Sequence, residues 1–88
     1  MKALRIKTLD YVLNSSRFQI ILLKDVVFSK IKYVDSKGEA IIQLELNNEE
    51  KFSLRLPCDE TEFERFKLRW NRFQDNEDNY FDLSAWGQ

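Results

Sequence analysis

The sequence predicts an α+β fold, in which an antiparallel β-meander of about five strands, a sheet or partly open barrel, is packed by one C-terminal amphipathic helix. Two observations carry this prediction. Apolar and polar residues alternate with a period of two between positions 26 and 56, as in half-buried strands. Large aromatic residues then recur at helical spacing between positions 60 and 74. We therefore expect one compact domain at residues 1–74 and an acidic and aromatic tail at residues 75–88.

The first elements are expected to be two strands, at residues 4–7 and 18–22, with their turn at residues 14–16. Residues 4–7 alternate between apolar and basic types. A helical turn stays open as an alternative here, because Leu9, Val12 and Leu13 also have helical spacing.

The central hairpin has an internal check on its register. Its loop, residues 35–38, consists of turn-forming types that include Gly38. Pairing across this loop sets Ile31 opposite Ile42 and Tyr33 opposite Ala40, so the apolar faces of the two strands agree. A third strand follows the turn at residues 47–49 and is expected to end at the proline of position 57.

A helix is expected from about residue 60 to residue 74. Asp59 with Glu62, and Thr61 with Glu64, both match the spacing of a capping box. Four aromatic residues fall on one face of this helix and are interpreted as core: Phe63, Phe66, Trp70 and Phe73. Strands first and a capped helix last, over residues 17–74, resemble in outline the small pleckstrin-homology-like domains of bacteria. This resemblance rests on element order, so it implies a fold and no ligand.

The residue types argue against catalysis and against a metal or cofactor. The chain has no histidine, which removes the usual general base and metal ligand. Its one cysteine, Cys58, cannot form an internal disulfide and is interpreted as packed, although a thiolate at the helix start is the alternative. Gly38 and Gly87 are too far apart for a phosphate-binding loop, and residues 75–86 lack the glycine and glutamate of a calcium loop. We expect no enzyme, no cofactor and no metal.

Charge is nearly balanced, with a net charge of −1, but it is unevenly distributed. Residues 1–37 carry eight basic and three acidic side chains, whereas residues 38–88 carry six and twelve. The longest apolar run, residues 20–23, is far too short to span a membrane, and we expect no signal peptide. The cytoplasm is the expected location.

Two surfaces are candidate binding sites. The tail has the composition of a protein-docking segment, and its candidate residues are Asp78, Tyr80, Phe81, Asp82, Leu83 and Trp86. The equal alternative is that the tail folds back onto the domain's own core. A basic set could instead track the phosphates of a nucleic acid, and its residues are Arg65, Arg69, Arg72, Lys30 and Lys32. The alternative for that set is a solvated helix flank.

These patterns predict a small protein-binding module without enzymatic activity, an adaptor or an inhibitor of the immunity-protein type that occupies a surface of a larger protein. A nucleic-acid-binding module is the alternative. Pairing of two copies through the outer edge of the meander is also open.

Overall fold

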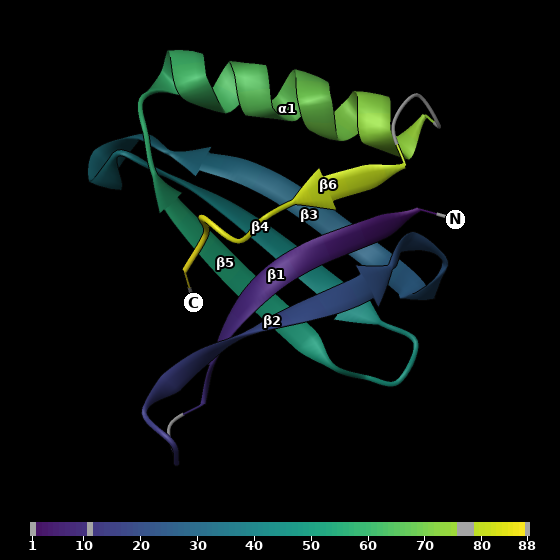
Figure 1. The fold of residues 1–88 in the computed structure, drawn as a ribbon. Helices are drawn as coiled ribbons and strands as arrows, with labels where there is room; N and C mark the ends of the chain where they lie inside the picture. The colour runs from purple at the N-terminus through teal and green to yellow at the C-terminus, as the bar shows by residue number, and fades with distance from the viewer. Residues whose placement is uncertain (1, 11, 76–78, 88) are drawn as a thin grey trace.

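The computed structural model describes residues 2–10, 12–75 and 79–87. Its elements, in chain order, are β1 (Ala3–Asp10), β2 (Ser15–Leu22), η1 (Leu23–Asp25), β3 (Val26–Val34), η2 (Asp35–Lys37), β4 (Glu39–Leu46), β5 (Lys51–Pro57), α1 (Glu60–Gln74) and β6 (Tyr80–Asp82). The strands form two three-stranded sheets, ordered β2-β1-β6 and β3-β4-β5, and α1 lies across one end of them (Figure 1). The predicted α+β class is confirmed, with six strands in the described part of the chain where about five were expected.

The meander follows the predicted register. Ile31 pairs with Ile42 and Tyr33 with Ala40, and β5 ends at Pro57. Gly38 closes the β3–β4 connection with a left-handed backbone, at φ 61°, which glycine adopts at no steric cost. Alternation with Ile31 and Tyr33 predicts that Val27 lies on the inward face, but Val27 is exposed, because the register shifts between Val26 and Phe28.

The N-terminal hairpin is longer than predicted. β1 and β2 pair over their full lengths, from Ala3 opposite Leu22 to Asp10 opposite Ser15. Residues 12–14 form the described part of the turn, and Asn14 adopts a positive φ of 51°, which asparagine tolerates. The strand interpretation of this region is therefore correct.

Helix α1 spans the predicted residues and begins with a capping box. The Asp59 side chain accepts a hydrogen bond from the Glu62 N–H at 2.8 Å, and the Glu62 side chain accepts one from the Asp59 N–H at 3.4 Å. Asp59, rather than Thr61, is thus the N-cap residue. All four aromatic residues of the predicted face are buried.

The cap gives a direct test of how the helix begins. Asp59→Ala should lower the free energy of unfolding by about 1 kcal/mol, because it removes the acceptor for one end of the helix. For a domain of this size, that corresponds to a decrease of about 4–8 °C in Tm. Thr61→Ala is the matched control. A larger decrease in Tm for Thr61→Ala than for Asp59→Ala would identify Thr61 as the N-cap residue.

The C-terminal segment requires a correction. Residues 75–88 were expected to form a tail outside the domain, yet β6 adds to β1 as a parallel strand, with Leu4 opposite Phe81. The segment folds back onto the domain, as the equal alternative for the tail predicts. Beyond β6, Gly87 and Arg55 of β5 exchange two backbone hydrogen bonds, of 2.6 and 2.9 Å. The segment therefore connects the two sheets on one side of the molecule (Figure 1).

Candidate functional site

The predicted docking residues of the C-terminal segment separate into two groups. Phe81, Leu83 and Trp86 are in the core, with exposed fractions of 9%, 0% and 4%. The Phe81 ring lies 5.5 Å from that of Phe66 and 5.4 Å from that of Trp70, centroid to centroid. These buried side chains are not a free docking surface, and the aromatic face of α1 packs on two of them, Phe81 and Trp86. Tyr80 and Asp82 remain exposed, and Asp78 lies outside the described residues.

Tyr80 and Asp82 belong to the outer face of the β2-β1-β6 sheet. Strand pairing places Asp82 beside Arg5 and Arg5 beside Ile20, and side chains at paired positions project from the same side of a sheet. We call this surface the β2-β1-β6 face and define it by six residues: Arg5, Lys7, Phe18, Ile20, Tyr80 and Asp82. Three of them are large and half exposed, at 58% for Phe18, 57% for Ile20 and 50% for Tyr80. This face therefore presents apolar side chains to solvent.

Arg5 is held at the middle of the β2-β1-β6 face by two neighbours. Its guanidinium carbon lies 3.9 Å from the centroid of the Phe18 ring, and its Nη1 lies 3.7 Å from Oδ2 of Asp82. Hydrogen bonds from the Ser84 side chain and backbone hold the pKa of Asp82 below its usual value, and Arg5 lowers it further. The carboxylate thus stays charged beside Arg5. Such an exposed ion pair adds little stability, so its main effect is to orient the guanidinium.

The sequence predicts a strand at this position, but it does not predict which side of the strand is exposed. Residues 18–22 were assigned to a strand, yet apolar residues occupy both of its sides, so alternation did not show which side is buried. The structure buries Ile21 and leaves Phe18 and Ile20 outside. The place of Tyr80 on the same face depends on parallel pairing with β1, which no local pattern reveals.

The edge of β2 is also unpaired within the described residues, because β2 is the outermost strand of its sheet. The Leu23 N–H donates to the Lys2 carbonyl at 2.9 Å, in the same register as the β1–β2 ladder. Because hydrogen-bonded pairs alternate in antiparallel sheets, the N–H and C=O groups of Phe18 and Ile20 point away from β1. The backbone groups of these exposed residues are thus presented along the edge.

A groove of about 300 Å³ adjoins this edge. Residues 19–22 of β2 form part of its lining, and Asp25, Asn48 and Glu50 supply polar groups beside them. Asp25 and Asn47 are bridged by a hydrogen bond of 3.3 Å between their side chains. The groove is therefore acidic at the C-terminal end of β2.

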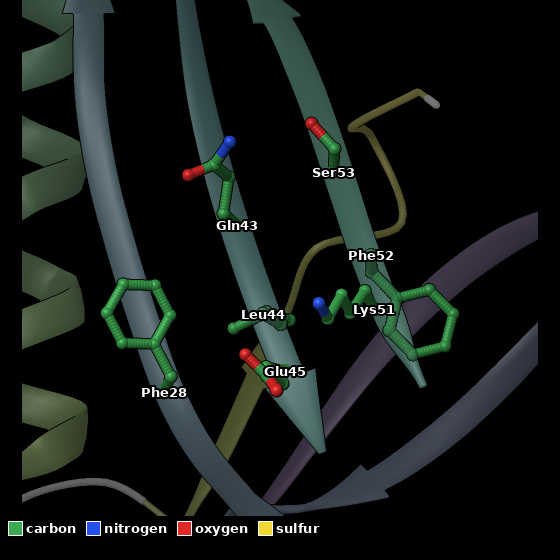
Figure 2. Close-up of a pocket in the computed structure, with 7 residues that line it drawn as sticks. All are labelled: Phe28, Gln43, Leu44, Glu45, Lys51, Phe52 and Ser53. Atoms are coloured by element: carbon green, nitrogen blue, oxygen red, sulfur yellow. The ribbon is translucent and has the colours of Figure 1, made fainter. Parts of the chain in front are cut away.

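A second hollow, also of about 300 Å³, lies over the β3-β4-β5 sheet near Phe28 (Figure 2). Glu45 and Lys51, which are cross-strand neighbours, line it together with Phe28. Opposite charges thus lie beside one half-exposed ring. This lining favours no single ligand class.

The basic residues predicted for nucleic acid lie on two different elements. Lys30 and Lys32 are exposed on β3, while Arg65, Arg69 and Arg72 are exposed on α1. The Gln74 side chain of α1 donates to the Ser29 hydroxyl of β3 at 3.3 Å. At 100° per residue, the three arginines fall on the flank of the helix opposite Gln74, so they face away from β3. The structure therefore does not merge the two basic groups into one patch.

The described residues indicate neither a metal cluster nor a reactive thiol. No group of three or more metal-ligating side chains occurs among them. Burial, together with Glu62 and Asp59, raises the pKa of the Cys58 thiol, which favours the packed interpretation of this residue over a reactive thiolate. No helix in the described part of the chain has the length and apolar character needed to cross a bilayer.

Comparisons with protein-family models, with curated proteins and with solved structures found no match. The outline resemblance to pleckstrin-homology-like domains therefore stays a prediction.

Proposed function

We propose that this protein is a protein-binding module, and that it occupies a surface of a larger partner through the β2-β1-β6 face. The observation that carries the proposal is that three half-exposed apolar side chains, Phe18, Ile20 and Tyr80, share one face of the sheet with an oriented arginine. Aromatic residues and arginine supply most of the binding energy in protein interfaces. As an adaptor or inhibitor, the protein would act by covering its partner, with the cytoplasm as its proposed location.

The charges on the face specify the chemistry of the partner. Lys7 is exposed next to Phe18, and Arg5 lies one pair further along β1. Asp82 is the one acidic side chain among the six residues that define the face. We therefore expect the partner to present apolar side chains together with carboxylates, because opposite charges speed association and fix the orientation of docking.

Nucleic acid is the second candidate, and the exposed arginines of α1 favour it. The β2-β1-β6 face itself fits this ligand less well. One side of the Phe18 ring is already covered by Arg5, whereas single strands bind to aromatic rings through base stacking. Ile20 offers no ring, and the net charge of −1 does not favour phosphates.

The test is a comparison of variants against one purified partner. The partner is first captured from cell lysate, with and without nuclease, and identified. Phe18→Ala and Tyr80→Ala should each weaken its binding at least tenfold in a calorimetric titration, which corresponds to about 1.4 kcal/mol or more. Thermal unfolding should change little, because both side chains are half exposed.

Leu68→Ala provides the matched control, since Leu68 is 65% exposed on α1, away from the face. It should bind the partner with unchanged affinity. Full affinity of both the Phe18 and the Tyr80 variants would disprove the proposed surface. Loss of all captured material on nuclease treatment, together with weaker retention when Arg65, Arg69 and Arg72 are changed to Gln, would favour the nucleic-acid function instead.

A further inference from the structure

We infer that β2 pairs with β2 of a second copy of this chain, antiparallel and with Gln19 on the twofold axis. The pairing is made by the backbone edge of the strand, so it does not rest on the proposed function, although it brings Phe18 and Ile20 of the β2-β1-β6 face next to the second copy. It would join two β2-β1-β6 sheets into one continuous six-stranded sheet.

The first support is the contrast between two edge strands. β3, one of the two edge strands of the other sheet, carries Lys30 and Lys32 and a register shift next to Phe28. Lysines and bulges are the features by which proteins prevent unwanted strand pairing. β2 has eight residues, and Arg17 is its sole charged residue. The edge of β2 thus lacks the protection that the edge of β3 has.

The second support is the match between backbone and side chains in this arrangement. With Gln19 on the axis, Phe18 lies opposite Ile20 of the second copy, and the reverse pair follows from the symmetry. Both residues present their N–H and C=O groups to the free edge, so each pair can exchange two hydrogen bonds. Their half-exposed side chains project from the same side and would cover each other. In this one register, the backbone groups of the edge form hydrogen bonds and the apolar side chains cover each other.

The third support is charge complementarity, which favours a second copy over an unrelated strand. Antiparallel pairing places Arg17 of one copy opposite Ile21 of the other. That position adjoins the groove lined by Asp25 and Glu50, at the acidic end of β2. The symmetry repeats this contact. The positive charge at the N-terminal end of β2 in each copy would therefore lie near the acidic groove at the C-terminal end of β2 in the other copy.

A mass measurement tests the pairing. In analytical ultracentrifugation over a range of protein concentrations, the wild-type chain should reach twice its monomer mass of 10.6 kDa. Ile20→Lys should weaken the dimer at least tenfold, because it places a charge opposite Phe18 at the edge. Tyr80→Ala should leave the dimer unchanged, since Tyr80 lies on β6, on the far side of β1. This control separates the dimer from the proposed partner surface.

Cross-linking tests the register without depending on how well the lysine variant folds. In a Cys58→Ser background, Gln19→Cys should oxidise to a disulfide-linked dimer, because two copies of position 19 meet on the axis at a pair that is not hydrogen-bonded. Ser15→Cys, on the same strand and the same side, should not, because it lies opposite residue 23 of the second copy. A wild-type protein that is monomeric at every concentration, or equal cross-linking at positions 15 and 19, would overturn the inference.

Discussion

Deletion of residues 79–88 is expected to unfold the protein. The deletion removes Phe81, Leu83 and Trp86 from the core, and these side chains are at most 9% exposed. It also exposes the aromatic face of α1, where the Phe66 ring lies 4.5 Å from that of Trp86. Finally, it leaves one side of β1 without its hydrogen-bonded neighbour.

The expected magnitude explains why unfolding should be complete. Removal of one buried large side chain costs about 2–5 kcal/mol, whereas a whole domain is stable by about 5–15 kcal/mol. Loss of three such side chains and a strand thus approaches or exceeds the total. Circular dichroism should show a loss of strand and helix signal without a cooperative thermal transition.

Tyr80→Ala is the control within the same segment, because it changes an exposed residue of β6 and keeps the strand. It should retain the cooperative transition. A truncated protein that keeps a wild-type spectrum and Tm would show that the two sheets and α1 are stable without β6, as an independent tail would require.

The elements with strong local patterns could be predicted from the sequence. The helix from residue 60 to residue 74 combines a capping box with four aromatic residues on one face, and the structure reproduces both features. The β3–β4 hairpin was equally accessible, because its turn and its apolar register agree. In these cases, residues that are close in the sequence are sufficient to predict the local structure.

The C-terminal segment shows why the rest was not predictable. Residues 80–83 alternate in the structure between exposed and buried side chains, as a strand does, but four residues are too few to distinguish a strand from a docking peptide. Its partner, β1, lies at the opposite end of the sequence. The candidate face depends on the same distant pairing, since Tyr80 shares a face with Phe18 and Ile20 only because β6 and β2 both pair with β1.

Trp70→Ala is expected to lower the free energy of unfolding by about 3–5 kcal/mol, the usual cost of deleting a buried large aromatic side chain. Trp70 is 2% exposed. Its ring lies 5.8 Å from that of Phe73 and 5.4 Å from that of Phe81, which meets it edge-on at 90°. The substitution would thus leave a cavity between α1 and β6, which the surrounding rings can fill only in part.

Leu68→Ala separates this packing effect from helix propensity, because Leu68 lies two residues away on the exposed side of α1. Alanine is at least as good a helix former as leucine, so the stability should change by less than about 0.5 kcal/mol. Urea unfolding followed by circular dichroism measures both variants on one scale. Equal midpoints for the two variants would mean that Trp70 contributes no more packing energy than an exposed leucine. That result would contradict the burial of the Trp70 ring between α1 and β6.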